Sequence, residues 1–327
     1  MKRTVYHKYG SPDVLELQDV DKPAVGDDGV LVRVCAASVN AGDWRLIRGR
    51  PYLVRLFTGL RKPKGILPGN DLAGCVEAVG RNVTQFNPGD EVIGNRNGAL
   101  AEYVCGKEQN FVLKPSRITF EQAAAVPVAG LTALQGLRDA GQIRPGQKIL
   151  INGAAGGVGT FAVQIAKSFG ADVTGVCSTK NLEMVRSLGA DRVLDYTKDD
   201  FTRSGQYYDL ILDVAGNRSL SDCRRALSRK GTLVLLGGSD GRWLGPAGRW
   251  LKGRALSQFV SQNLVPFLSK SSKADLLYLM ELIEASKLTP VVDRTYPLSA
   301  VSEAICYLEE GHARGKVIIT MDCDSSI

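Results

Sequence analysis

Histidine and closely spaced cysteine are scarce in this chain. Of its 327 residues only His7 and His312 are histidine, and neither stands in a cluster of potential ligands. The seven cysteines are spread singly, without the spacing of a disulfide framework or a zinc knuckle. We therefore expect reduced, mostly packed thiols, and these scarcities argue against a metal centre.

Long apolar runs are also missing. No stretch approaches the roughly 20 apolar residues of a membrane-spanning helix, and the opening MKRTVYHKYG has no apolar run behind its basic residues. We expect a cytoplasmic protein with no integral membrane association. A chain of this length with 44% hydrophobic and 23% charged residues can bury two cores, so we expect two domains.

Acidic residues are absent between Asp43 and Asp71, within a chain of net charge +7. The basic residues of this segment are Arg45, Arg48, Arg50, Arg55, Arg61, Lys62 and Lys64, interleaved with Tyr52, Leu53, Leu56 and Phe57. A second basic segment, 242–254, surrounds Trp243 and Trp250. Either segment suits a membrane surface or nucleic acid, but basic side chains more often cover apolar surface with their stems. We expect no nucleic-acid partner and leave open what the segments serve.

The segment KILINGAAGGVG, residues 148–159, is the most informative part of the chain. An apolar strand at 148–152 runs into a turn in which Ala154, Gly156 and Gly159 take the small positions of the dinucleotide-binding fingerprint. An alanine is acceptable at the first position where the turn has negative φ. Apolar residues then recur at helical spacing, and the free N–H groups of that helix attract phosphate. The residues predicted to bind the cofactor here are Ala154, Ala155, Gly156, Gly157, Val158 and Gly159.

Strands and helices alternate after this turn, which predicts a doubly wound parallel sheet. The expected strands are 172–177, 192–196, 208–214 and 231–237. The expected helices are 181–188, closed by Gly189, and 220–229, closed by Gly231.

The first 115 residues contain short alternating strands between Gly, Pro, Asp and Asn residues, as in a small irregular β-barrel. Thr119 and Gln122 form a capping box that starts a helix. Residues 290–297 are again predicted to be extended. A helix is expected at 300–310, and a last strand follows it at 316–321. We predict a Rossmann domain at 121–289 and a discontinuous catalytic domain at 1–120 with 290–327, with the dinucleotide and a small substrate in a cleft between them.

Taken together, these residues resemble the medium-chain dehydrogenase/reductase superfamily, and within it the zinc-independent quinone oxidoreductase family. The motifs are SVNAGDW (38–44), PGNDLAGCVEAVG (68–80), FNPGDEVIG (86–94), AAVPVAGLTAL (124–134), the AAGGVG turn and GKVIIT (315–320). The resemblance implies a GroES-like β-barrel from both ends of the chain and a Rossmann domain between them. It also implies a homodimer formed by edge-strand pairing near 256–265.

Metal-dependent relatives carry a catalytic Cys, His and Cys or Asp. By the resemblance, the metal cysteine corresponds to Asn40, the metal histidine to Asn70, and the third ligand falls near Val128 or Ala129. None of these is a strong zinc ligand. We therefore predict no catalytic metal.

The cofactor is predicted from the end of the second strand of the nucleotide-binding domain. NAD-selective enzymes place a carboxylate there, whereas this chain has Ser178 and Lys180, which favour the additional phosphate of NADPH. We expect a preference over NADH of at least about tenfold. The resemblance adds Tyr196. The cofactor-binding set is completed by Val214, Ala215, Leu236, Gly237 and Lys316. Residues 238–254 are expected to form a lid over the substrate or to pack in the dimer.

Without a metal, conjugated acceptors are the simplest substrates, because charge developing on a quinone or an enone is already delocalised. We expect Asn40 to orient the nicotinamide or the substrate carbonyl, Tyr52 to donate its O–H to the substrate, and Thr132 to line the nicotinamide pocket. Each of the three residues has an alternative structural role: Asn40 could satisfy backbone groups, Tyr52 could pack on the surface, and Thr132 could cap helix contacts. Two other functions stay open: a trans-acting enoyl-thioester reductase whose segment 45–64 receives a phosphopantetheine carrier, and a non-catalytic NADPH-binding or membrane-associated protein.

Overall fold

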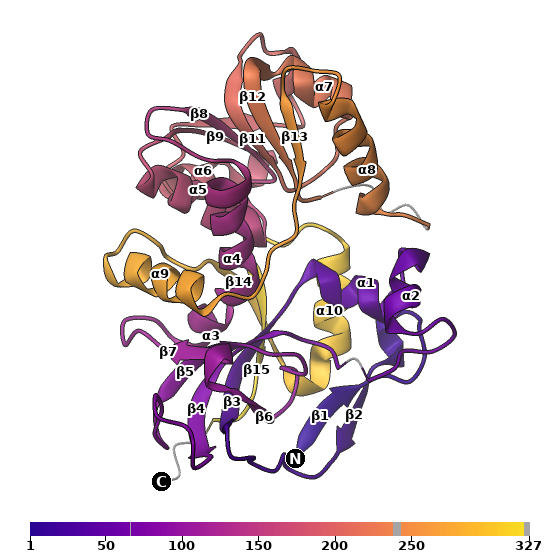
Figure 1. The fold of residues 1–327 in the computed structure, drawn as a ribbon, viewed down its shortest axis with the longest axis vertical. Coiled ribbons are helices and arrows are strands. Elements are labelled where there is room, and N and C mark those ends of the chain that lie inside the picture. The colour runs from indigo at the N-terminus through magenta and orange to yellow at the C-terminus, as the bar shows by residue number, and fades with distance from the viewer. Residues whose placement is uncertain (66, 238–242, 324–327) are drawn as a thin grey trace. The chain divides into compact units, whose positions relative to one another are not determined.

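The computed structural model describes residues 1–65, 67–237 and 243–323. It separates into two compact units, which we describe one at a time (Figure 1). Unit 1 comprises residues 1–129, 271–286 and 290–327, and unit 2 comprises residues 130–270 and 287–289. Helix α9 (Lys273–Glu284) therefore groups with unit 1, whereas the sequence analysis placed its residues in the nucleotide-binding domain.

Unit 2 is built on a parallel sheet of strand order β10-β9-β8-β11-β12-β13. The strands are β8 (Lys148–Asn152), β9 (Asp172–Cys177), β10 (Arg192–Asp195), β11 (Tyr208–Asp213), β12 (Leu227–Leu235) and β13 (Asn263–Pro266). The helices are α5 (Gly157–Ser168), α6 (Leu182–Ser187), α7 (Leu220–Arg225) and α8 (Pro246–Ser257), with the end of α4 (Pro127–Gln135) and a π-helical segment, Gly136–Ala140. Ile149, Leu150 and Ile151 are fully buried, as expected for a central strand covered on both faces. The predicted doubly wound sheet is confirmed.

Two predicted elements at the β12 side of this sheet are shorter in the structure than expected. Helix α7 ends at Arg225, and Leu227 already pairs with Tyr208, so Gly231 lies within β12 and does not cap a helix. A Cβ atom at Gly231 would lie 3.0 Å from the Tyr208 carbonyl oxygen, so the glycine permits close strand pairing at an irregularity in the register. The edge strand expected near 256–265 is confined to β13, because residues 246–257 form α8.

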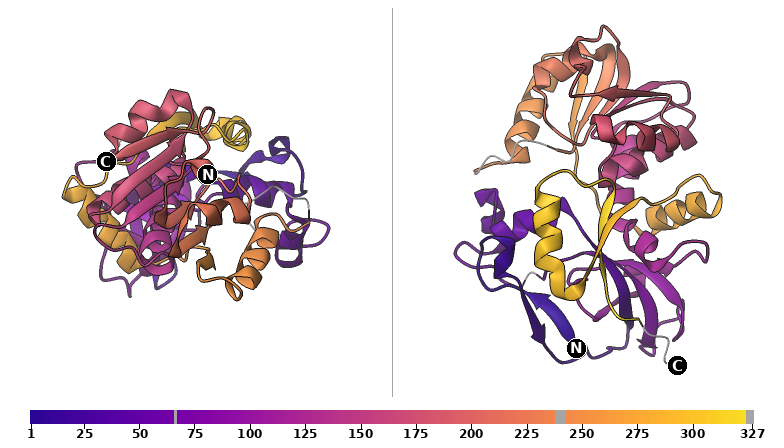
Figure 2. Two further views of the ribbon diagram at one scale, coloured as in Figure 1. Left: turned by 90° about the horizontal axis from the view of Figure 1, so that it is seen from above. Right: turned by 180° about the vertical axis from the view of Figure 1, so that it is seen from behind.

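Unit 1 contains a mostly antiparallel sheet of order β14-β15-β3-β4-β5-β7, with β6 also paired to β3. The strands are β3 (Gly29–Val39), β4 (Asp71–Val79), β5 (Glu91–Asn95), β6 (Tyr103–Lys107), β7 (Phe111–Leu113), β14 (Val292–Pro297) and β15 (Lys316–Thr320), with a separate hairpin of β1 (Lys2–Val5) and β2 (Glu16–Asp19). The helices are α1 (Ala41–Arg48), α2 (Arg55–Thr58), α3 (Phe120–Ala124), α9 and α10 (Val301–Glu309), and α10 lies beside β15 (Figure 2). Thr119 caps α3 through the predicted box with Gln122.

The last strand joins the two ends of the chain within unit 1. β15 runs antiparallel to β3, with Thr320 opposite Ala36, which brings Cys323 next to Cys35. These two cysteines form a disulfide with their Cα atoms 5.0 Å apart, so the expectation of seven reduced thiols is wrong at this pair. The two cysteines are 288 residues apart in the sequence, so the spacing of the cysteines does not predict that they pair.

No helix in the part of the chain that the structure describes is long and apolar enough to cross a membrane.

Candidate functional site

The glycine turn of unit 2 has the geometry of a phosphate-binding turn. Gly153 carries the positive φ of +92°, and among the described non-glycine residues only Gln142 and Ser286 have positive φ. Ala154 is therefore unstrained, and its N–H donates to the Val176 carbonyl at 3.0 Å. The alanine at the first fingerprint position is thus compatible with the turn.

The other two small residues of the fingerprint, Gly156 and Gly159, have different surroundings. A Cβ atom at Gly159 would lie 2.1 Å from the Gly153 carbonyl oxygen, so this glycine permits the close packing of α5 on the turn. At Gly156 the nearest described atom beyond its chain neighbours would be 3.6 Å from the Cβ, so the described residues leave the space above this residue open. Gly156 also precedes the first residue of α5, and no side chain in the described part of the chain caps this helix. An anion can therefore approach the N–H groups of the first turn.

The ends of β9 and β10 bring two predicted adenosine-side residues together. Asp195 pairs with Cys177 in the parallel register, and the Tyr196 N–H donates to the Cys177 carbonyl at 3.0 Å. Ser178 follows Cys177, so Ser178 and Tyr196 leave adjacent strands at the same edge of the sheet. Tyr196 is 43% exposed, and Lys180 is also exposed. These side chains can reach a ligand at this edge.

Asp195 is a carboxylate at this edge that the sequence analysis did not weigh. Its side chain is buried, and it accepts hydrogen bonds from the hydroxyls of Thr179 at 2.5 Å and Thr197 at 2.7 Å. The hydrogen bond from Thr179 is the main cause that lowers the pKa of Asp195, which keeps it ionised. Its two threonine partners hold it within the protein, and the exposed cations near it are Lys180 and Lys198, whose ammonium lies 3.9 Å from the Asp195 carboxylate.

The predicted nicotinamide-side residues directly follow β11 and β12. The N–H groups of Val214 and Ala215 donate to the Asn152 carbonyl, and those of Leu236 and Gly237 donate to the Asp213 carbonyl. A ligand can therefore meet these residues only through carbonyl oxygens and side chains.

A buried polar cluster that the sequence analysis missed supports these strand ends. The Asn152 side chain donates to Asp213 at 2.7 Å and to Asn217 at 2.9 Å. Arg249 of α8 forms an ion pair with Asp213 at 2.5 Å. Arg249 belongs to the segment 238–254, which was expected either to form a lid or to pack in the dimer. Residues 238–242 of that segment lie outside the described residues.

In unit 1, Asn40 lies between β3 and α1, and its side chain belongs to a buried polar network. The Asn40 amide nitrogen donates to Asp71 at 2.8 Å, and the Asn40 amide oxygen accepts from the Lys316 ammonium at 2.5 Å. Lys316 also donates to the Val39 carbonyl at 3.3 Å and lies 3.4 Å from Asp71. Asn40 is thereby held in one orientation.

Asp71, at the start of β4, is the centre of this network and is completely buried. Besides Asn40 and Lys316, its carboxylate accepts from the Ser38 hydroxyl at 2.8 Å, the Val128 N–H at 3.0 Å and the Asn95 amide at 3.3 Å. Burial lowers the pKa of Lys316, and the charges of Asp71 and Asp43 oppose that shift. The sequence analysis placed Lys316 in the cofactor set. The structure shows its ammonium group hydrogen-bonded within unit 1.

Asp43 is a second buried carboxylate beside this network. It accepts from the N–H groups of Asn40 at 2.7 Å and Gly69 at 3.1 Å. Burial is the largest influence and raises the pKa of Asp43 to about 6, although both hydrogen bonds act in the opposite direction.

The pKa of Asp43 predicts a pH-dependent contribution to stability. Because the folded-state pKa is above the unfolded value of 3.8, this contribution is fully present below pH 3.8 and is lost as pH rises through about 6. We expect the free energy of unfolding of the wild type, relative to Asp43→Asn, to fall by up to about 3 kcal/mol between about pH 4 and pH 7. Urea unfolding across this range measures it, with the exposed Asp21→Asn as control. Parallel profiles for wild type and Asp43→Asn would contradict the assignment.

The other two predicted catalytic residues have different surroundings. Tyr52 belongs to a 3₁₀ turn of unit 1 (Tyr52–Val54), and the Arg55 guanidinium lies 4.9 Å from its ring centroid. Thr132 belongs to the part of α4 in unit 2, where its hydroxyl lies 2.8 Å from that of Ser269. Asn40 and Tyr52 thus share unit 1, and Thr132 belongs to unit 2.

The residues that the resemblance matches to the metal ligands of metal-dependent relatives do not fit zinc. The amide oxygen of Asn40 is occupied by an ammonium group, and the backbone N–H of Val128 is bound to Asp71. Zinc requires thiolate, imidazole or carboxylate ligands around one open point, and a lysine ammonium beside that point repels a cation. Among the described residues, the one grouping of metal-ligand type is Cys35, Cys75 and Cys323, and two of these are joined in the disulfide.

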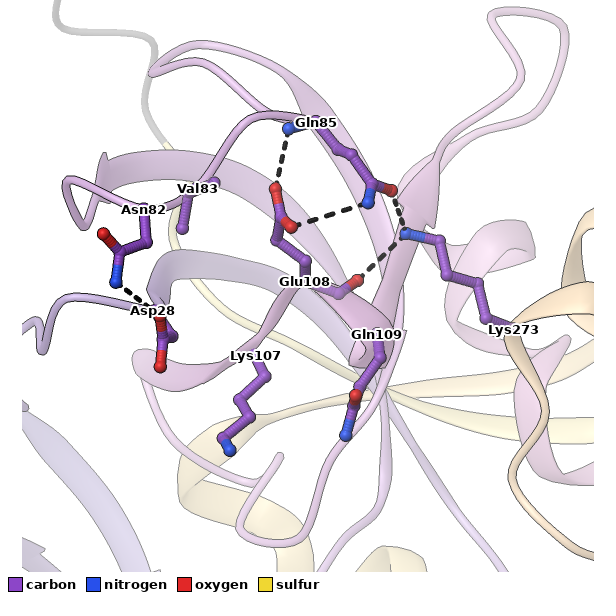
Figure 3. Close-up of a pocket in the computed structure, with 8 residues that line it drawn as sticks. All are labelled: Asp28, Asn82, Val83, Gln85, Lys107, Glu108, Gln109 and Lys273. Atoms are coloured by element: carbon purple, nitrogen blue, oxygen red, sulfur yellow. Dashed lines mark hydrogen bonds between the residues drawn. The ribbon is translucent and has the colours of Figure 1, made fainter.

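A pocket of about 310 Å³ on unit 1 contains none of the predicted site residues (Figure 3). Its polar groups largely bond one another: Lys273 donates to the Gln85 side chain at 2.6 Å, and Glu108 accepts from the Gln85 N–H at 2.7 Å. Asn82 donates to Asp28 at 2.8 Å. We therefore do not assign the proposed cofactor or substrate to this pocket.

Comparison with known proteins adds independent information. A family model described as an alcohol dehydrogenase GroES-like domain matches residues 26–116, and one described as a zinc-binding dehydrogenase matches residues 188–319. The chain is 34% identical to a chloroplast envelope quinone oxidoreductase homolog of Arabidopsis thaliana, over 96% of either chain. It is 36% identical to a chloroplastic NADPH-dependent alkenal/one oxidoreductase of the same plant, over 98% of this chain and 79% of the relative. The solved structure of a quinone oxidoreductase from Coxiella burnetii superposes with a TM-score of 0.85 at 30% identity, covering 98% of this chain and 99% of the other.

Proposed function

Because the chain belongs to the medium-chain dehydrogenase/reductase superfamily and, within it, to the quinone oxidoreductase-like family, we propose that it is an NADPH-dependent, metal-free reductase of quinones or α,β-unsaturated carbonyls. The observation that carries this proposal is the Lys316–Asn40–Asp71 network at the position where metal-dependent relatives bind their ion. The names of the relatives support the same substrate class.

The network supports a conjugated acceptor. Bound NADPH would supply a hydride. On a quinone or an enone the resulting negative charge spreads over several atoms, so a few hydrogen bonds suffice to stabilise it. An amide NH2 has two hydrogens, and among the described residues Asn40 uses one of them, on Asp71. We propose that the second hydrogen orients the nicotinamide or the substrate carbonyl, with Lys316 as a positioning residue acting through Asn40.

We propose contacts with the substrate or the cofactor for the remaining predicted site residues. Tyr52 would donate its O–H to the substrate, and Thr132 would line the nicotinamide pocket. The turn at 154–159 would hold the pyrophosphate, supported by the open space at Gly156 and the uncapped start of α5. Val214, Ala215, Leu236 and Gly237 would contact the nicotinamide half.

The proposed NADPH preference depends on Lys180, with Ser178 and Tyr196. We expect kcat/KM with NADPH to exceed that with NADH at least about tenfold, a difference of about 1.4 kcal/mol. Lys180→Ala should remove most of this preference by weakening NADPH binding, because it deletes one of the exposed positive charges at this edge. Lys230→Ala, at another exposed lysine of unit 2, is the control. Equal efficiency of the wild type with both coenzymes would overturn the assignment.

Assembly and location are also proposals. β13 is the edge strand of the unit 2 sheet, and we propose that it pairs with its counterpart in a homodimer. Sedimentation velocity of the full chain tests this. A cytoplasmic location stays a prediction, and both Arabidopsis relatives named above are chloroplast proteins.

A panel of acceptors tests the reaction. NADPH oxidation by chelator-treated protein should be supported by quinones or short enals and not by simple ketones. Turnover confined to a crotonyl thioester would instead indicate an enoyl-thioester reductase. Saturable NADPH binding without turnover on any acceptor would favour a non-catalytic protein, and zinc-dependent alcohol oxidation would contradict the metal-free proposal.

A further inference from the structure

Unit 1 exposes a group of apolar side chains around α2. Phe57 is 84% exposed, Leu60 is 68% exposed, Leu56 is 64% exposed and Leu53 is 36% exposed. These residues lie within eight positions of one another, on a 3₁₀ turn, a short helix and the residue that follows Gly59. Single exposed leucines are ordinary on protein surfaces, but a contiguous group marks an interaction surface.

This exposure does not result from a loosely attached segment. The Tyr9 hydroxyl lies 2.7 Å from both the Thr58 hydroxyl and the Gly59 carbonyl oxygen. The Arg55 side chain donates to the Gly49 carbonyl at 2.9 Å and lies over the ring of Tyr9 at 4.5 Å. The segment is therefore anchored through Thr58 and Arg55, and its apolar side chains project from a fixed base.

Positive charges flank the same side chains. Arg50, Arg61, Lys62 and Lys64 are exposed, and no acidic residue occurs between Asp43 and Asp71. Within the described residues these four cations form no ion pair, in contrast to Arg48, which pairs with Glu309. We call the four apolar and four basic residues the α2 patch. It lacks the internal counter-charges that neutralise an ordinary solvated surface.

We propose that the α2 patch docks the protein on the surface of an anionic phospholipid bilayer. Leucine and phenylalanine side chains on a fixed base can enter the region between headgroups and acyl chains, while adjacent lysine and arginine side chains contact lipid phosphates. The docking is peripheral, in keeping with the lack of a spanning helix among the described residues. It does not depend on the proposed reaction.

Nucleic acid fits the patch less well than lipid does. Both ligands offer phosphates to the cations, but single-stranded nucleic acid also requires aromatic faces for its bases. Phe57 is the single strongly exposed aromatic residue of the patch, and the other apolar members are aliphatic. Aliphatic side chains gain most from an acyl environment.

Vesicle sedimentation with the full chain tests the docking. We expect the chain to partition at least about tenfold more strongly onto vesicles with about one third phosphatidylserine than onto pure phosphatidylcholine, and to be released at roughly 0.5 M salt. The triple variant Leu56→Ser/Phe57→Ser/Leu60→Ser and the triple variant Arg61→Gln/Lys62→Gln/Lys64→Gln should each lower partitioning about tenfold or more. Tyr207→Ser, which alters a tyrosine of unit 2 that is 62% exposed and lies outside the proposed dimer segment, should have no effect.

A second variant reports insertion directly. The wild-type fluorescence of Trp44, Trp243 and Trp250 sets the background. Brominated lipids in anionic vesicles should quench the additional fluorescence of Phe57→Trp, whereas they should not quench that of Tyr207→Trp, at an exposed residue of unit 2. Equal partitioning of both triple variants and the wild type, or no quenching of Phe57→Trp, would overturn the proposal. It would also be overturned if the charge variant lost binding to single-stranded RNA but kept vesicle binding, or if the apolar variant changed the oligomeric state without changing partitioning.

Discussion

Gly156→Val is expected to weaken NADPH binding at least about a hundredfold, or about 2.7 kcal/mol, while the protein stays folded. Gly156 has extended backbone angles, φ −81° and ψ 176°, which valine adopts readily. The nearest protein atom to an added Cβ is 3.6 Å away, so the new side chain fills the open space above the turn. In our proposal that space belongs to the pyrophosphate, and two branched methyl groups would exclude it.

Two other glycines provide controls for this variant. Gly159→Val should unfold the turn, because its Cβ would lie 2.1 Å from the Gly153 carbonyl oxygen. At Gly26, in unit 1, an added Cβ meets no atom of the described residues beyond its neighbours within 4 Å, so Gly26→Val should leave both stability and NADPH affinity unchanged. Isothermal titration with NADPH and thermal unfolding separate loss of binding from loss of fold. Wild-type affinity in Gly156→Val would place the pyrophosphate elsewhere.

Lys316→Met is expected to lower the free energy of unfolding by about 3 kcal/mol. Removing the ammonium leaves the completely buried Asp71 carboxylate without its cationic partner. Four hydrogen-bond donors still contact Asp71 in the variant. Because they partly stabilise the carboxylate, we expect a loss of stability near the lower end of the range of about 3–5 kcal/mol for breaking a buried ion pair.

A double variant tests whether the loss comes from the unpaired charge. Lys316→Met/Asp71→Asn removes both charges and should recover part of the stability lost in Lys316→Met. Lys230→Met, at an exposed lysine, should change the free energy of unfolding by less than about 0.5 kcal/mol. Urea unfolding measures all three. A cost below about 1 kcal/mol for Lys316→Met, or no recovery in the double variant, would show that the pair does not stabilise the fold.

The parts of the fold that are specified by residues close together in the chain were predictable from the sequence. The glycine turn, the alternation of strands and helices and the Thr119–Gln122 capping box all depend on residues within a few positions of one another, and the structure bears them out. Gly231 shows the limit of such signals. A glycine after a basic helical turn is typical of a helix end, but here tertiary pairing of Leu227 with Tyr208 starts the strand earlier.

The network around Asp71 and the disulfide depend on contacts that no local pattern contains. Lys316 is 276 positions from Asn40, and the antiparallel pairing of β15 with β3 brings them together. Asn40 was singled out from sequence because of the position it takes in the family motif, not because of its partners. The same strand pairing places Cys323 beside Cys35. Asp195 was missed because its inward orientation, held by two threonines, has no sequence signature.

The most direct test of the proposed reaction is the fate of a labelled hydride. The chelator-treated protein is incubated with an acyclic enone and with NADPH that carries two deuterium atoms at C4 of the nicotinamide, so that either face delivers deuterium. The product is analysed by mass spectrometry and NMR. We predict a saturated ketone with one deuterium on the carbon β to the carbonyl. Deuterium on the carbonyl carbon of an alcohol product, or no transfer to quinone or enone under conditions where NADPH binds, would contradict hydride delivery to a conjugated acceptor.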